Sequence, residues 1–341
     1  MNGSLEKLVQ KGLGRSVSVN SVEKLHGDAS YRTYSRVRLS DGTSVIVMQM
    51  PAGRASASEE ITNFSGRHEE LPFINVAKFL RDAGLAVPEI YLHDEEKNVL
   101  ILEDLGDELM ARKVEGAGDA ERLAWYRKAI DLLVSLREIT DGRRNEGCVA
   151  FMRSFDSTLL NWEFDHFLEY GIEARLSLKM SEGDLTAFRE ETRRISAAIE
   201  SLPRGFTHRD FQSRNLIVRD GGLFLIDFQD ALLGPAVYDL VALTRDSYIE
   251  LSKGVLEELL RYYSEKTRRD LGEVRGEFDL ITIQRKLKDA GRFVYIDRVK
   301  GNPGFLKYIP ASLGYVREAL ERRPELGKLR EALLPYVPEW R

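Results

Sequence analysis

The apolar pattern of the chain changes once, after "LEDLGD" at residues 102–107, and this change limits the possible folds. Before it, short runs rich in β-branched residues are separated by turn signals. The strongest of these is Ser40-Asp41-Gly42, between "SRVRL" and "TSVIVMQM". After it, apolar residues recur with the 3.6-residue period of amphipathic helices, as in "ERLAWYRKAIDLLVSLREI". The sequence therefore predicts an α+β fold with a β-rich first part and a helical second part.

The first part, residues 1–105, is expected to form a small antiparallel sheet. Its runs follow the order β-β-β-α-β-β, with the helix at "FINVAKFLRDAG" and the last two strands in "VPEIYLHDEEKNVLILE". The second part, residues 106–341, is expected to be mainly helical, with an inserted hairpin at "NLIVRD" and "LFLIDF". Two lobes of this kind leave a cleft between them, which is a preferred place for a small-molecule site.

Composition narrows the class of partner. The chain has 341 residues and a net charge of −5, with no basic block, so neither nucleic acid nor an anionic membrane is expected as a partner. The single cysteine, Cys148, excludes an internal disulfide and suits a reducing compartment. No apolar run is long enough for a signal peptide or a membrane span. We therefore expect a cytoplasmic protein with no obligate protein partner.

The candidate catalytic groups lie in "THRDFQSRN" and in the hairpin that follows it. Asp210 and Asn215 fit the pattern H-R-D-x-x-x-x-N, and Asp227 ends the run "LFLID". Phosphoryl transfer needs a carboxylate near the attacking hydroxyl and hard oxygen ligands for magnesium. Asp210 would orient the acceptor hydroxyl and take its proton, while Asn215 and Asp227 would bind Mg²⁺. The alternative, that all three are turn and cap residues, is disfavoured by the β-rich part before the loop and the hairpin after it.

Two further polar residues are expected to have structural roles. His208 has no second histidine nearby, which favours a loop-bracing hydrogen bond over a role as ligand or base. Asp239 follows Gly234-Pro235 and is expected to cap a helix or brace the catalytic loop, because aspartate favours such local bonds.

These motifs resemble those of the aminoglycoside-phosphotransferase and choline-kinase superfamily, the small-molecule relatives of protein kinases. The resemblance is closest to the anomeric sugar kinases that phosphorylate N-acetylmuramate and N-acetylglucosamine at C1 in cell-wall recycling. It implies a bilobal protein-kinase-like fold and a kinase that uses ATP and Mg²⁺. The blocks that carry it run in family order from about residue 25 to 310: "LHGDASYRTYSRV", "VPEIYLHD", "LILEDLGD", "THRDFQSRNL", "LIDFQDALLGPAVYDLVAL", "TRDSY" and "QRKLKDAGRF".

The resemblance also implies where a nucleotide would bind. "GDAS" would replace a glycine-rich phosphate loop, with Gly27 and Ser30 facing the phosphates. "LEDLG" would be the hinge, with the backbone of Glu103 to Leu105 contacting adenine. From the residues alone, these segments are a Gly-Asp turn before a strand and a simple connector.

The phosphate-binding pair of protein kinases is missing. A strand lysine usually pairs with a helix glutamate, but Met48 stands in the lysine slot (Gln49 if the alignment shifts by one) and Phe73 in the glutamate slot. Their joint loss is consistent with an apolar contact in place of the ion pair. Arg32 and Arg36 are the nearest cations, and we hypothesise that Arg32 supplies part of the missing charge, the alternative being a solvated arginine. Loss of the lysine is also compatible with a non-catalytic pseudokinase. The intact base and metal ligands argue against that alternative.

The acceptor is expected to be a small molecule. Between Asp227 and the next helical pattern lies only "FQDALLGPAVYDLVAL". This stretch is shorter than the activation segment that supports a peptide substrate in protein kinases, and it has no A-P-E motif. Candidates to hydrogen-bond a sugar are Glu163, Arg245 and Asp246. Trp162 could stack on a sugar ring, but we favour the interpretation that it packs in the core of its helix.

The identity of the acceptor rests on the resemblance, which favours the anomeric hydroxyl of an N-acetylated amino sugar. Glu163, Asp165 and Glu169 argue weakly against a strongly anionic acceptor. They would equally suit an aminoglycoside, choline-like or amino-alcohol substrate, so that alternative stays open.

Overall fold

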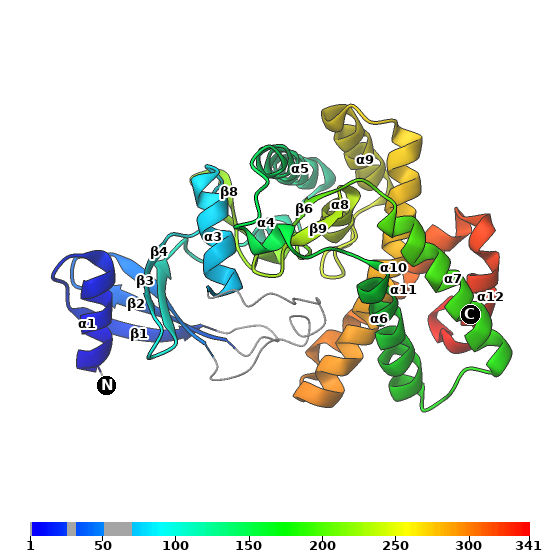
Figure 1. Ribbon diagram of the computed structural model, residues 1–341, viewed down its shortest axis with the longest axis horizontal. Helices are drawn as coiled ribbons and strands as arrows, with labels where there is room; N and C mark the ends of the chain where they lie inside the picture. Colours follow the sequence, from blue (N-terminus) through cyan, green and yellow to red (C-terminus); the bar gives the residue numbers. More distant parts are fainter. Residues whose placement is uncertain (1, 26–31, 51–69) are drawn as a thin grey trace. The chain divides into compact units, whose positions relative to one another are not determined.

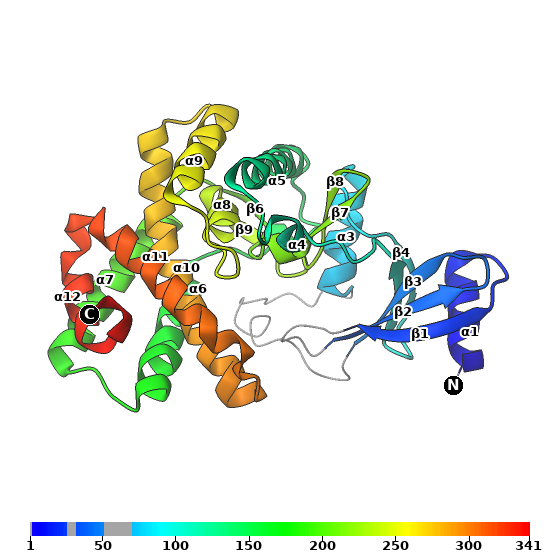
Figure 2. The ribbon, with the colours of Figure 1, turned by 180° about the vertical axis from the view of Figure 1, so that it is seen from behind.

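The computed structural model describes residues 2–25, 32–50 and 70–341. Its contacts divide the chain into two compact units (Figures 1 and 2). Unit 1 comprises Met1–Glu108 and Ile217–Asp230, and unit 2 comprises Leu109–Leu216 and Ala231–Arg341. The sequence predicted a boundary between the two parts after residue 105, with the inserted hairpin in the helical part. In the structure, contacts group residues 217–230 with the β-rich unit.

Unit 1 is built on an antiparallel sheet of five strands in the order β1-β2-β3-β5-β4. Among the described residues, α3 is the helix between β3 and β4, which agrees with the predicted order β-β-β-α-β-β. The elements are β1 (Val19–Leu25), β2 (Thr33–Leu39), β3 (Ser44–Gln49), α3 (Pro72–Asp82), β4 (Ile90–Asp94) and β5 (Val99–Glu103).

A helix that the sequence did not predict, α1 (Asn2–Leu13), precedes the sheet. It packs against β4 and β5, and Val9 joins a core with Val37, Val45 and Ile101. A helix of this length is marginal in isolation, so packing rather than local propensity stabilises it.

The connector "LEDLGD" is tied to the sheet by a buried arginine. Arg36 on β2 donates to both carboxylate oxygens of Asp104, at 2.6 and 3.0 Å, and to Asp107 at 2.5 Å. Ser44 also donates to Asp104, at 2.6 Å. Breaking a buried ion pair costs about 3–5 kcal/mol, so these bonds fix the connector firmly. Arg36 is therefore committed to unit 1 and is not the missing phosphate-directed cation.

The predicted hairpin is confirmed as β7 (Leu216–Arg219) and β8 (Gly222–Leu225). Its turn residues Asp220 and Gly221 have φ of 52° and 74°, the left-handed backbone that tight hairpins require. The hairpin joins unit 1 through hydrogen bonds from Val218 N to Glu108 O (2.6 Å) and from Leu225 N to Ala86 O (2.8 Å).

Unit 2 is mainly helical, as predicted, and α10 (Leu271–Lys300) runs through it (Figure 2). This helix packs against α6, α7, α8, α9 and α11. Most of its buried residues are apolar, but Arg285, Lys286 and Asp289 lie buried in its middle. The other helices are α4 (Met110–Val114), α5 (Asp119–Asp141), α6 (Ser157–His166), α7 (Glu182–Glu200), α8 (Val237–Thr244), α9 (Lys253–Thr267), α11 (Ile309–Glu321) and α12 (Gly327–Leu333).

Unit 2 also contains a π-helix and a small sheet. A π-helix, Phe167–Ala174, continues α6 without a break. A two-stranded sheet pairs β6 (Arg204–Thr207) with β9 (Leu232–Pro235) and leads into the predicted catalytic loop, residues 208–215. Among the described residues, no helix is both long enough and apolar enough to cross a membrane.

Candidate active site

Asp239 on α8 holds the loop that follows β6. Its buried carboxylate accepts backbone N–H bonds from His208 (2.7 Å) and Arg209 (3.0 Å). Arg209 has a φ of 72°, a strained conformation for a non-glycine residue that these bonds help to maintain. The expectation that Asp239 braces the catalytic loop is confirmed.

Arg285 holds the next residue, Asp210. This fully buried arginine donates to the Arg209 carbonyl (2.6 Å), to the Tyr238 hydroxyl (3.1 Å) and to Asp210 Oδ1 (3.2 Å). The planar guanidinium has several donors in fixed directions, so one side chain can position both the backbone and the carboxylate. The Asp210 side chain stays 39% exposed, so part of the carboxylate remains accessible.

The charge of this carboxylate is set by competing effects. Burial acts to raise the pKa of Asp210, but the positive charges of Arg285, Lys288 and Arg209 outweigh it and lower the pKa below its ordinary value. Asp210 is therefore ionised at neutral pH, and an ionised carboxylate can accept a hydrogen bond from a hydroxyl group.

The end of the loop is held by two further contacts. Asn215 Nδ2 donates to the Asp210 carbonyl (2.8 Å), which fixes the amide plane and leaves its oxygen as the end suited to a cation. Ser213 donates to Asp246 through its hydroxyl (2.6 Å) and its N–H (3.3 Å). Asp246 is buried, so its position supports a role in holding the loop.

The other two predicted substrate residues are also buried and engaged. Glu163 accepts from Arg209 (3.1 Å) and Gln284 (2.5 Å). Arg245 pairs with Glu318 (3.0 Å) and stacks on Tyr315, with 4.6 Å from guanidinium to ring centre. These contacts favour bracing roles for Glu163, Arg245 and Asp246, whose direct contact with an acceptor stays a prediction.

Asp227, the residue after β8 and Ile226, belongs to unit 1. Its φ of 65° is again unusual for a non-glycine residue, and Gln229 Nε2 donates to its Oδ1 (2.9 Å). The next residue, Phe228, stacks on Phe73 of α3, with ring centres 5.1 Å apart. Phe73, the residue predicted to replace the kinase glutamate, thus makes an apolar contact, and Met48 is fully buried.

Arg32 lies just before β2, in the electrostatic field of the Asp227 segment. Burial acts to lower the pKa of its guanidinium, but Tyr34, Asp227 and Asp230 raise it more. The predicted phosphate-directed cation is thus close enough to Asp227 to interact with it, and its contact with phosphate stays a prediction.

The remaining nucleotide-site predictions fall on the hinge and on "GDAS". Glu103 is engaged through its side chain, which accepts from Arg219 (2.7 Å), and its backbone N–H donates to the Glu89 carbonyl (2.8 Å). Leu105 is buried. Gly27 and Ser30 lie outside the described residues.

Sequence reasoning missed Arg285 and Lys288. The block "QRKLKDAGRF" was part of the resemblance, but no role was given to its charges. The available signal was a cluster of charges in the middle of a segment otherwise rich in buried apolar residues. Such charges are rarely buried unless they are paired, which points to a function for the pairing.

Solved structures of other proteins share this fold. One is choline kinase LicA from Streptococcus pneumoniae, with a TM-score of 0.60 and 17% identity, covering 93% of this chain and 98% of that one. Another is the ADP-bound aminoglycoside phosphotransferase APH(2'')-Ib, with a TM-score of 0.58 and 14% identity, covering 94% and 99%. The predicted bilobal protein-kinase-like fold class is confirmed.

The chain belongs to the phosphotransferase enzyme family, whose model matches residues 21–276. Two curated relatives are both named N-acetylmuramate/N-acetylglucosamine kinase. The Pseudomonas putida protein is 27% identical over 98% of this chain and 93% of its own length. The Neisseria meningitidis protein is 28% identical over 91% and 89%. The predicted family is therefore confirmed, and the chain is a phosphotransferase.

Replacing Arg285 by methionine should raise the pKa of the Asp210 carboxyl, because the charge that most favours its ionised form is removed. The measurement is a pH titration of carbon-13-labelled aspartate followed by NMR. Arg285→Lys keeps the charge and should keep the pKa low.

Arg275→Met is the matched control. Arg275 is also on α10, but it is partly exposed and pairs with Glu257. An Asp210 pKa that is the same in Arg285→Met and in the unmodified protein would contradict this account of the site.

Proposed function

We propose that the chain transfers the γ-phosphoryl group of ATP to the anomeric hydroxyl of an N-acetylated amino sugar. The observation that carries the proposal is the half-exposed, ionised Asp210, fixed by Arg285 in a catalytic-loop sequence. The named relatives support the acceptor, because their similarity extends over 91–98% of this chain.

In this mechanism, the acceptor hydroxyl donates a hydrogen bond to Asp210. A new bond forms between the acceptor oxygen and the γ-phosphorus as the bond from that phosphorus to the β-phosphate oxygen breaks, which releases ADP. The hydroxyl proton passes to Asp210. Because the transition state of phosphoryl transfer is loose, the hydroxyl needs orientation more than early deprotonation. A carboxylate whose pKa is held low suits that role.

Asn215 and Asp227 are the proposed Mg²⁺ ligands. An amide oxygen and a carboxylate are hard donors that suit this ion, and the Asn215 amide is already oriented through Nδ2. The ion would supply positive charge to the β- and γ-phosphate oxygens. Gly27, Ser30, Arg32, Glu103 and Leu105 are the proposed nucleotide contacts.

Two alternatives are less well supported. An aminoglycoside, choline or amino-alcohol acceptor agrees with the fold neighbours, but likeness at 13–18% identity supports the fold alone. A non-catalytic pseudokinase would have no physical reason to keep Asp210, Asn215 and Asp227 together with a buried arginine that positions the base. We propose the cytoplasm as the location, where ATP is available and the lone Cys148 stays reduced.

Replacing Asp210 by asparagine should lower kcat by at least about a hundredfold, because the acceptor hydroxyl loses its proton acceptor. A coupled ADP-release assay with N-acetylglucosamine, N-acetylmuramate, an aminoglycoside and choline measures this, and nucleotide binding should be spared. Asp220→Asn, at an exposed turn residue, is the control. Retained turnover would show that another group is the base, and turnover with choline or the aminoglycoside alone would contradict the sugar acceptor.

Replacing Arg32 by alanine should raise the KM for ATP several-fold, since the proposed phosphate-directed charge is lost. Arg38→Ala, an exposed arginine on β2 paired with Glu23, should leave that KM unchanged. The same KM in Arg32→Ala and the unmodified protein would leave Arg32 with no role at the phosphates.

A further inference from the structure

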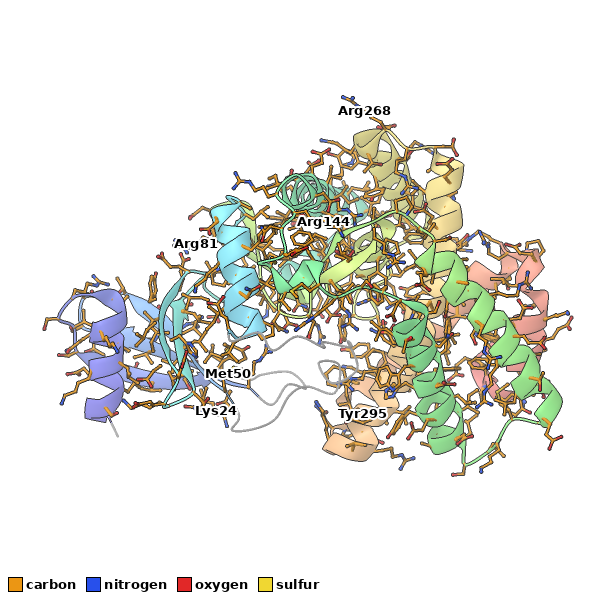
Figure 3. All side chains as sticks on the ribbon, viewed as in Figure 1. Lys24, Met50, Arg81, Arg144, Arg268 and Tyr295 are labelled. Carbon is orange, nitrogen blue, oxygen red and sulfur yellow. The ribbon has the colours of Figure 1, made fainter. Side chains whose placement is uncertain are left out.

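Unit 2 contains a cluster of aromatic rings around His166, the last residue of α6. Its imidazole stacks on Trp162 at 5.2 Å between ring centres, and lies 4.8 Å from Tyr170 and 5.4 Å from Tyr295. Figure 3 labels Tyr295 on α10, the helix packed against α6. His166 is only 6% exposed, and within the described chain its Nε2 has no hydrogen-bond partner. A buried polar atom without a partner calls for an explanation, such as a ligand.

Two cations adjoin this ring cluster. The Arg292 guanidinium lies over the Tyr295 ring, 4.7 Å from its centre, and no carboxylate among the described residues pairs with it. Lys288 pairs with Asp289 at 3.0 Å. Burial lowers the pKa of His166, and the charges of Arg292 and Lys288 lower it further, to about 4. At neutral pH the cluster thus combines a neutral imidazole with positive charge.

Backbone contact holds the cluster in place. A Cβ added at Gly291 would lie 2.8 Å from Phe167 Cα and 3.0 Å from His166 O, so α10 can approach this closely only because residue 291 is glycine. The approach occurs where the π-helix begins, a rare geometry that is frequent at functional sites. Arg292 follows Gly291 directly and is thereby positioned near His166.

The cluster is connected to the catalytic base along α10. Arg285, Lys288 and Arg292 are spaced by three and four residues, so they lie along one side of the helix. Arg285 contacts Asp210, and Lys288 acts electrostatically on both Asp210 and His166. The axial rise from residue 285 to residue 292 is about 10 Å. A small acceptor with one hydroxyl at Asp210 could therefore present a second group to the cations.

We propose that Arg292, assisted by Lys288, binds a carboxylate on the acceptor sugar and so sets a preference for acidic over neutral amino sugars. The inference rests on the proposed function. A guanidinium that lies over an aromatic ring can still present N–H donors to a carboxylate. N-acetylmuramate carries such a carboxylate, and N-acetylglucosamine does not. Of the three acidic residues that weighed against an anionic acceptor in the sequence, Glu163 pairs with Arg209 and Glu169 interacts with the Tyr170 hydroxyl.

The test compares three acceptors that differ in this group: N-acetylmuramate, its methyl ester and N-acetylglucosamine. Arg292→Gln should raise the KM for N-acetylmuramate by about tenfold or more, the loss expected when a charge-assisted contact is removed. The KM for the two neutral acceptors and all kcat values should change by less than about twofold. Arg292→Lys should recover part of the loss. Arg298→Gln, an exposed arginine on the same helix, is the control.

An equal rise in KM for all three acceptors would overturn the inference, since it would mean a structural role for Arg292. Equal KM values of the unmodified protein for N-acetylmuramate and for its methyl ester would also overturn the inference. If the unmodified protein turns over none of the three acceptors, the proposed function fails. The inference is then tested by calorimetric titration of the protein with N-acetylmuramate. Binding that Arg292→Gln abolishes would support it, and absence of binding would overturn it.

Discussion

The geometry of the catalytic loop depends on burying one arginine. Removing a guanidinium from water costs several kcal/mol, and good hydrogen bonds must offset that cost. Arg285 finds them in the Arg209 carbonyl, the Tyr238 hydroxyl and the Asp210 carboxylate. Satisfying the arginine therefore forces the loop into one conformation, and the same contacts keep Asp210 ionised.

The charges beside Arg285 extend this arrangement. Lys286 donates to Asp289 (2.8 Å) and to Ser247 (3.0 Å), the residue after Asp246, which accepts from Ser213 in the catalytic loop. Breaking one partner of such a network leaves a buried charge uncompensated, at a cost of about 3–5 kcal/mol. The middle of α10 is thus a fixed electrostatic frame, and on the proposed account its C-terminal half also recognises the acceptor.

Local signals in the sequence predicted much of this molecule. The strands and the hairpin follow from alternation and turn residues such as Asp220-Gly221, and the catalytic loop follows from the spacing of Asp210 and Asn215. Long-range features were not predictable in the same way. Helix α1 depends on packing against the sheet, and the role of Arg285 depends on a contact with a residue 75 positions away. Glu163 was identified as a polar candidate, but only the fold shows that Arg209 and Gln284 already engage it.

The most direct test of the central claim is the position of the phosphate in the product. N-acetylglucosamine and ATP are incubated with the protein, and the product is analysed by phosphorus–proton correlation NMR. The account predicts a correlation from phosphorus to the anomeric proton, H1 of the sugar. A correlation to the C6 protons would contradict it, because the hydroxyl oriented by Asp210 would then not be the anomeric one.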